Sequence, residues 1–294
     1  MTVSTTPVTF YSWGARCSGV LWRPGVQDTA GPHPAIVLAN GFRGVKEWIL
    51  PEYAELFAEA GFVTLTFDYR GFGSSEGTRG MIVPHDQVED VRSAVTFVAG
   101  QDGVDRERIS LWGTSFGAAN VVVAGAADDR VAAVVCQVGF GDWARSLRES
   151  LPSGRFDEIV ERCRTDREQR VLTGRSGTVD PNWVLDNPES AEAMRAVVDR
   201  FPNIVTEMPL EAIERTLEYR PETAAASISP RPVLFVGTTR DRVVPVEETH
   251  RLHAAAAEPK ELELLDIDHY QIYQSPYREK AASVAVDFLR RHLR

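Results

Sequence analysis

Short apolar runs alternate with amphipathic segments over the first half of the chain. An uninterrupted apolar run is typical of a strand that is covered on both faces, as in a parallel sheet. Between the runs, apolar residues recur at the spacing of one helix face. Strands joined by single helices predict right-handed crossovers and a mostly parallel sheet. The expected strands are 35–39, 63–67, 109–112 and 131–136, the expected helices 52–60 and 85–98, and an antiparallel hairpin is expected at 8–12 and 18–22.

The alternation stops after residue 136 and resumes near the C-terminus. Residues 142–229 are rich in charges, helix formers and prolines and show no convincing strand. A segment of this length with its own apolar positions is not an ordinary loop. We therefore expect an α/β core of residues 1–141 and 230–294 and a helical insertion at 142–229. Within the insertion we expect helices at 155–175 and 191–219, and after it strands at 233–236 and 262–265 and helices at 247–257 and 280–293.

The charge balance narrows the range of partners. The 294 residues include 42 acidic and 32 basic side chains, a formal charge of −10. Nucleic acids and anionic membranes bind basic surfaces, so neither is an expected partner. No apolar run approaches the ~18 residues of a membrane span, and no basic segment precedes an apolar one at the N-terminus. We expect a small-molecule substrate, and the sequence leaves a homodimer open.

Three cysteines indicate the compartment. Cys17, Cys136 and Cys163 are odd in number and widely spaced, which suits a reducing cytoplasm better than a disulfide framework. No pair has the spacing of metal ligands. We therefore expect a cytoplasmic protein without a bound metal.

The strand expected at 109–112 leads into Gly113-Thr114-Ser115-Phe116-Gly117, followed by small residues that can begin a helix. This is a G-x-S-x-G motif in the strand–turn–helix context that the motif requires. A serine on so sharp a turn has strained backbone angles, and side chains two residues to either side would collide with neighbouring backbone. The turn exposes Ser115 Oγ and places the N–H of Phe116 at a helix N-terminus, where it can stabilise an oxyanion.

A serine nucleophile needs a base, and a third group must hold that base. Of the six histidines, His269 differs from the others because it directly follows a strand. It would begin a loop at the carboxyl edge of the sheet, where Ser115 also lies. Asp241 follows another strand at that edge and is the favoured orienting acid. Two rivals stay open: Asp268, which neighbours His269, and Asp142, which follows the strand after Ser115.

These features resemble the α/β-hydrolase family over nearly the whole chain. Within that family the chain is most similar to the dienelactone-hydrolase and prolyl-peptidase-like esterases, whose D-x-R-G-x-G-x-S loop resembles D-Y-R-G-F-G-S-S at 68–75. The resemblance implies a second oxyanion donor, the backbone N–H of Phe42, because Asn40-Gly41-Phe42 matches the family's His-Gly pair and the next residue. It also implies that the insertion at 142–229 is a helical cap over the site.

The triad and the resemblance together imply a cofactor-independent serine hydrolase. It would cleave a small-molecule ester, lactone, thioester or amide through an acyl-enzyme on Ser115, with His269 as base and Asp241 as orienting acid. Phe42, Trp143 and Tyr270 are candidate pocket residues that would give an aromatic-lined site, and for each the alternative is a place in the core. The alternative is hydrolysis of a C–C bond in a β-diketone-like compound, which the same triad supports on related scaffolds. A non-catalytic ligand-binding protein is a third class.

Overall fold

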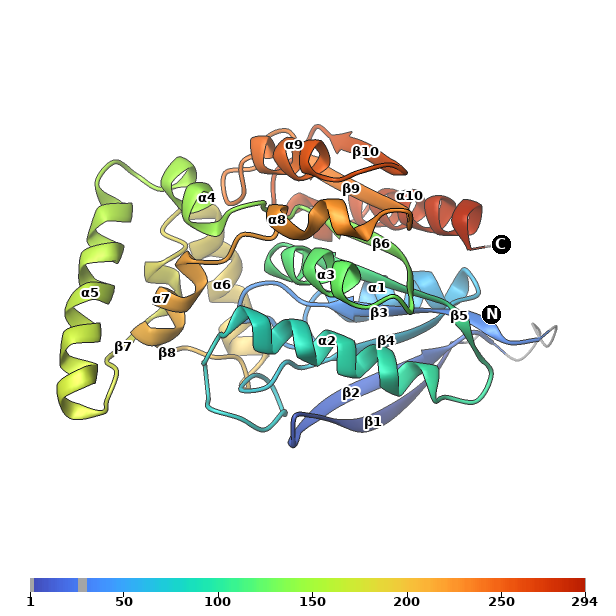
Figure 1. The fold of residues 1–294 in the computed structure, drawn as a ribbon, viewed down its shortest axis with the longest axis horizontal. Helices are drawn as coiled ribbons and strands as arrows, with labels where there is room; N and C mark the ends of the chain where they lie inside the picture. The colour runs from blue at the N-terminus through green and yellow to red at the C-terminus, as the bar shows by residue number, and fades with distance from the viewer. Residues whose placement is uncertain (1–2, 26–30, 294) are drawn as a thin grey trace.

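Eight strands form one sheet at the centre of the computed structural model, which describes residues 3–25 and 31–293. Residues 1–2, 26–30 and 294 of the expected core lie outside this description. The strand order is β1-β2-β4-β3-β5-β6-β9-β10 (Figure 1). The β1–β2 and β2–β4 pairs are antiparallel, and the others are parallel, as predicted. The strands are β1 Ser4–Ser12, β2 Ala15–Arg23, β3 His33–Ala39, β4 Val63–Phe67, β5 Val104–Thr114, β6 Val131–Gln137, β9 Val233–Thr238 and β10 Lys260–Leu265.

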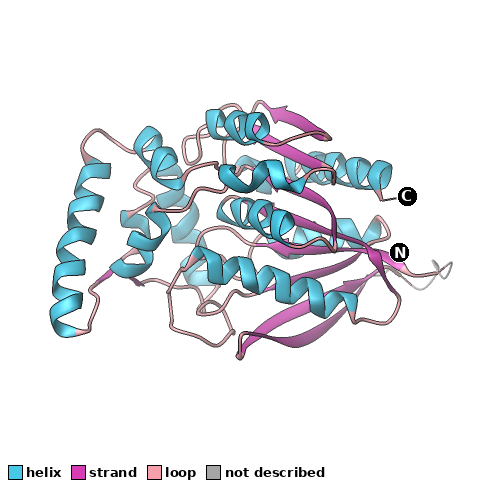
Figure 2. Cartoon of the chain, viewed as in Figure 1, coloured by secondary structure: helices cyan, strands magenta, loops and turns pink. Residues whose placement is uncertain are grey.

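Helices cover both faces of this sheet (Figure 2). On one face, α1 and α10 bury Phe57 and Phe288 against Ile36 and Trp112 of the strands. The opposite face is covered by α2, α3 and α9. Burial on both faces explains why the parallel strands are continuous apolar runs. These helices are α1 Leu50–Glu59, α2 Pro84–Ala99, α3 Phe116–Ala127, α9 Val246–Ala255 and α10 Tyr277–His292, close to the expected ranges.

Residues 143–217 of the insertion lie beyond one end of the sheet, whereas residues 222–228 pack beside α3 and α9 (Figure 1). Two expectations about the insertion at 142–229 need correction. The helix expected at 191–219 is two helices, α6 Pro188–Arg200 and α7 Leu210–Leu217, because Pro202 forces Phe201 out of the helical conformation. Two short strands, β7 Thr178–Val179 and β8 Met208–Pro209, also pair antiparallel where no strand was expected. The other elements are α4 Trp143–Ser150, α5 Arg155–Thr173, α8 Glu222–Ala225 and the 3-10 helices η1 Pro181–Trp183 and η2 Ala226–Ile228, with η3 Gln271–Tyr273 in the core.

A buried carboxylate fixes the start of the insertion to the core. Glu248 of α9 accepts hydrogen bonds from the backbone N–H groups of Gly141 and Asp142 and from Arg145 of α4. Burial opposes the ionisation of Glu248, but the hydrogen bonds from Arg145, Asp142 and Arg251 outweigh it and lower the pKa of the carboxyl. The ionised side chain therefore acts as a fixed anchor for the chain as it leaves β6.

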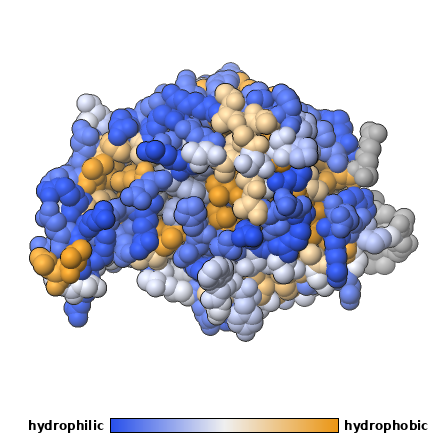
Figure 3. Space-filling model, in the orientation of Figure 1, coloured by the Kyte–Doolittle hydropathy of each residue, from blue (hydrophilic) through white to orange (hydrophobic). Residues whose placement is uncertain are grey.

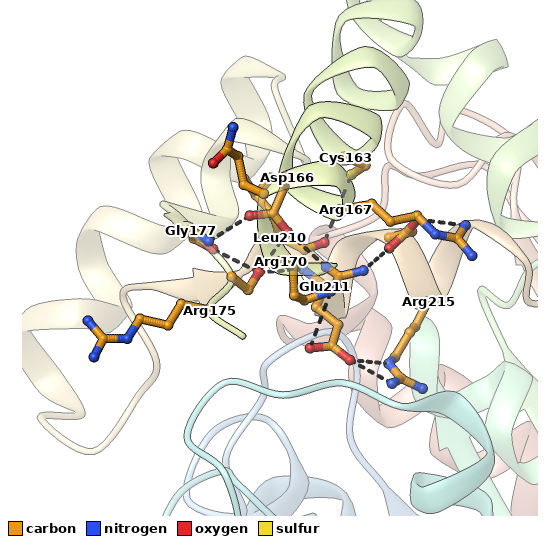
Figure 4. Close-up of polar contacts among 12 residues, drawn as sticks. Cys163, Asp166, Arg167, Arg170, Arg175, Gly177, Leu210, Glu211 and Arg215 are labelled. Carbon is orange, nitrogen blue, oxygen red and sulfur yellow. Dashed lines mark hydrogen bonds and ion pairs between the residues drawn. The ribbon is translucent and has the colours of Figure 1, made fainter. Parts of the chain in front are cut away.

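Charged side chains hold the outer helices of the insertion together (Figure 4). Arg170 of α5 contacts Asp166 of the same helix at 2.8 Å and also pairs with Glu214 of α7. Asp166 in turn accepts hydrogen bonds from Ser176 and from the N–H of Gly177 at the start of the β7 segment. This ion-pair cluster joins α5, the segment that leads into β7, and α7.

The face shown in Figure 3 is mostly hydrophilic, with an apolar patch where the far end of α5 lies. Val171 and Leu172, at this end of α5, are each 80% exposed. Within residues 3–25 and 31–293, no helix is long and apolar enough to cross a membrane.

Replacing Arg170 by alanine should lower the free energy of unfolding by about 1–2 kcal/mol, because it leaves the nearly buried Asp166 without its cation. Arg164→Ala is the matched control on the same helix. Arg164 also pairs with two glutamates, but its side chain is 58% exposed, against 19% for Arg170. The control should cost less than about 0.5 kcal/mol. Chemical denaturation of both variants measures the difference, and equal losses would contradict the role assigned to the cluster.

Candidate active site

Ser115 lies at the turn between β5 and α3 in a strained conformation. Its φ of 55° and ψ of −123° are unusual for a residue with a side chain. The glycines of the motif make this turn possible. A Cβ on Gly113 would lie 2.3 Å from the carbonyl oxygen of Gly117, and one on Gly117 would lie 2.3 Å from that of Ala39. The turn therefore depends on close backbone contacts between β5, α3 and the end of β3.

His269 is bonded to one of the three candidate acids. Its Nδ1 lies 2.7 Å from Asp241 Oδ2. The N–H groups of Val243 and Val244 donate to the other oxygen of Asp241, and Thr238 Oγ1 donates to Oδ2. These bonds fix the carboxylate, which in turn favours the proton on Nδ1 and leaves Nε2 as the acceptor. Both side chains are almost fully buried.

The two rival acids have other partners. Asp142 Oδ1 caps α4 by accepting from the N–H of Arg145, and Oδ2 lies 3.1 Å from Arg220. Asp268 Oδ1 accepts from the N–H groups of Tyr270 and Gln271 within its own turn. The geometry therefore favours Asp241 as the partner of His269.

The loop after β3 places a backbone N–H beside Ser115. A Cβ on Gly41 would lie 3.1 Å from Ser115 Cβ, so the loop passes very close to the serine. Within the described part of the chain, the N–H groups of Phe42 and Phe116 have no hydrogen-bond acceptor. Asn40, which replaces the family's histidine, uses its side-chain amide on the carbonyls of Val45 and Trp48. It therefore stabilises the loop and leaves the two N–H groups as candidate oxyanion donors.

The D-x-R-G loop at 68–75 is hydrogen-bonded to the loop after β3 that carries Phe42. Buried Asp68 accepts hydrogen bonds from the backbone N–H and the ammonium of Lys46, and from the N–H of Ser74. Arg70 pairs with buried Asp90 at 2.6 Å. The motif thus joins the end of β4 to the loop that carries Phe42, which fits the structural role expected for it.

A buried polar network, which the sequence did not reveal, holds the loop that carries His269. Tyr273 and Thr114, the residue before Ser115, share a hydrogen bond of 2.8 Å. Tyr53 of α1 donates to the carbonyl of Ile272 at 2.8 Å. The pKa of Tyr273 is raised well above its usual value by burial, so its hydroxyl stays neutral. The network joins the turn of the serine to the loop of the histidine.

Ser115 and His269 line one narrow cavity of about 40 Å³ between the core and the insertion. Tyr270 lines it as expected, and its hydroxyl donates to Ser190 of α6. The expectation for Trp143 is corrected, because Trp143 is 1% exposed and packs against the rings of Phe42 and Phe116 behind the cavity. The other apolar walls are Phe42, Trp48, Ile49, Leu185, Met194 and Val243.

Two charged side chains near the cavity were missed by sequence analysis. Arg43 lines the cavity and is only 3% exposed, with a φ of 51°. Burial lowers the pKa of its guanidinium. Glu189 of α6 lies near the histidine loop, and burial, followed by the charge of Asp268, raises the pKa of its carboxyl. No periodic pattern marks either residue, because their burial arises from the fit between core and insertion.

The site can supply a nucleophile, a base held by an acid, and two backbone donors. Among the described residues, no cluster of three or more His, Cys, Asp or Glu side chains is arranged to hold a metal ion. The three cysteines are buried and unpaired within the described ranges.

Comparison with known proteins gives consistent matches. Residues 30–268 match the family described as serine aminopeptidase, S33. An uncharacterized 31.7 kDa protein from the traX-finO intergenic region of Escherichia coli is 36% identical, over 89% of this chain and 92% of its own length. The thiohydrolase aneE of Aspergillus aculeatus is 29% identical, over 87% of this chain and 85% of its own.

A solved structure agrees with these sequence matches. The α/β hydrolase GrgF from Penicillium sp. sh18 is 27% identical and superposes with a TM-score of 0.81, covering 100% of this chain and 99% of its own. The fold expected from the sequence is thereby confirmed. The chain belongs to the serine aminopeptidase S33 family of α/β-hydrolases and is an enzyme of the serine hydrolase class.

Proposed function

We propose that the enzyme hydrolyses a small-molecule ester, lactone, thioester or amide through a covalent acyl-enzyme on Ser115. The observation that carries the proposal is the 2.7 Å hydrogen bond from His269 to a fixed Asp241, in a cavity that Ser115 also lines. A base oriented in this way is what a serine hydroxyl needs to become a nucleophile.

The reaction proceeds in two halves. His269 Nε2 takes the proton of Ser115 as Oγ attacks the substrate carbonyl, and Asp241 stabilises the imidazolium that forms. The N–H groups of Phe42 and Phe116 donate to the oxyanion of the tetrahedral intermediate, each contributing about 3 kcal/mol to the transition state. His269 then gives the proton to the leaving group. Water repeats the sequence on the acyl-enzyme and releases the acid.

The insertion at 142–229 acts in this proposal as a cap that limits the substrate. It supplies Leu185 and Met194 to the cavity wall, and His269 is only 2% exposed beneath it. A largely apolar cavity favours a substrate with an apolar body. The thiohydrolase among the relatives supports thioesters as one class to test.

A substrate panel tests the proposed activity. Phenyl acetate, a γ-lactone, an acyl thioester, an anilide and a β-diketone are each incubated with the wild type, with Ser115→Ala and with Ser227→Ala, a control at an exposed serine. We expect turnover of at least one acyl substrate, unchanged in the control and lowered about 10³-fold or more in Ser115→Ala. Cleavage of the β-diketone alone would instead favour the C–C hydrolase. Full activity in Ser115→Ala would contradict the mechanism.

The identity of the orienting acid can be tested separately. Asp241→Asn should lower kcat about 10³- to 10⁴-fold, because an amide donor at this position favours the wrong tautomer of His269. Asp142→Asn, at the rival acid, should lower kcat less than about tenfold because its carboxylate caps α4. Steady-state kinetics on the ester that turns over fastest measures both. A larger loss of kcat in Asp142→Asn than in Asp241→Asn would overturn the assignment of Asp241 as the orienting acid.

A further inference from the structure

Arg43 is a buried cation in the catalytic cavity that has no carboxylate partner. Arg43 is 3% exposed, and it follows Phe42, whose backbone N–H is a candidate oxyanion donor. Among the described residues, no carboxylate oxygen lies within 4.0 Å of its guanidinium. Buried charges in proteins are normally paired, because an unpaired one costs several kcal/mol of desolvation.

A neighbour on the same loop shows the usual arrangement. Lys46 is also buried, and its ammonium contacts Asp68 at 2.7 Å and Glu47 at 2.6 Å. At the start of the insertion, Arg145 likewise pairs with Glu222 and Glu248. Arg43 therefore differs from Lys46 and Arg145, which both pair with carboxylates.

The partners of Arg43 are neutral and come from the insertion. Nη1 donates to the carbonyl of Val205 at 3.0 Å, and Nη2 donates to Asn182 Oδ1 at 2.7 Å. A guanidinium has five N–H donors, so most of its hydrogen-bonding capacity is unused. Burial lowers the pKa of Arg43, and the charge of Asp180 only partly opposes this; the Asp180 carboxylate does not pair with the guanidinium, and its Oδ1 accepts from the N–H of Asn182. An uncharged donor could make the hydrogen bonds to Val205 and Asn182 equally well. These two contacts therefore do not explain why a positive charge is buried at Arg43.

We propose that Arg43 binds a carboxylate carried by the substrate. Because Arg43 lines the same cavity as Ser115 and His269, the carboxylate would belong to the molecule whose carbonyl Ser115 attacks. The substrate class is then an ester or thioester with a second, free carboxylate on its acyl or its leaving group. Planar guanidinium groups bind carboxylates with charge-assisted, often bidentate hydrogen bonds. This inference rests on the proposed hydrolase function and narrows it.

Two pairs of isosteric esters test the inference and separate the two positions of the carboxylate. On the acyl side, phenyl hydrogen glutarate is compared with phenyl 5-methylhexanoate, in which an isopropyl group replaces the carboxylate. On the leaving-group side, 4-acetoxybenzoate is compared with 4-isopropylphenyl acetate. The quantity measured is the ratio of kcat/KM for the charged ester to that for the neutral ester. The enzyme's charge of −10 would by itself disfavour the charged ester.

In the wild type we expect a ratio of roughly 10 to 100 in at least one pair, the range for hydrogen bonds to a charged group. Arg43→Gln keeps hydrogen-bond donors for Val205 and Asn182 but removes the charge, and it should bring the ratio close to 1. Arg43→Lys should retain part of the preference. Arg79→Gln is the matched control, because exposed Arg79 also joins the core to the insertion by donating to the carbonyl of Asn203, and it should leave the ratio unchanged.

Several results would overturn the inference. A wild-type ratio near 1 in both pairs, with the neutral esters hydrolysed, would leave the proposed function intact and remove the carboxylate site. An equal loss of kcat/KM for both members of a pair in Arg43→Gln would show that Arg43 only holds the insertion against the core. No hydrolysis of these four esters or of any acyl substrate in the panel above would overturn the proposed function itself, and this inference with it.

Discussion

The closeness of three backbone segments around Ser115 is the constraint on which the site depends. The turn after β5, the first turn of α3 and the loop after β3 approach so tightly that Gly41, Gly113 and Gly117 leave no room for a side chain without displacement. Because these segments meet here, Phe42 and Phe116 lie at the same edge of the sheet as the serine. Backbone donors held in this way need no reorganisation when charge develops on a substrate.

The parallel sheet brings the remaining groups to the same edge. Asp241 and His269 follow β9 and β10, and both side chains are nearly inaccessible to water. Burial strengthens the interaction between a histidine and a carboxylate because the local dielectric is low. Leu185 and Met194 of the insertion line the same cavity, and the insertion is fixed to the core through Glu248 and through the contacts of Arg43.

The sequence predicted the sheet, its flanking helices and the bonded pair of His269 and Asp241. The fold could be predicted because buried parallel strands are continuous apolar runs. His269 and Asp241 could be chosen as candidates because groups at the carboxyl ends of such strands converge. The break at Pro202 and the β7–β8 pairing were missed, since short elements in a charged insertion have no period to detect. The place of Trp143 behind the cavity and the burial of Arg43 could not be predicted either. Both depend on how the insertion packs against the core, which local sequence does not encode.

The central claim is that His269 and Asp241 activate Ser115 in the folded enzyme. Intact-protein mass spectrometry after treatment with a fluorophosphonate tests it most directly, because the probe forms an adduct with an activated serine. We expect one adduct on the wild type, none on Ser115→Ala and strongly slowed labelling of His269→Ala. An unlabelled wild type, or an adduct that persists in Ser115→Ala, would contradict it.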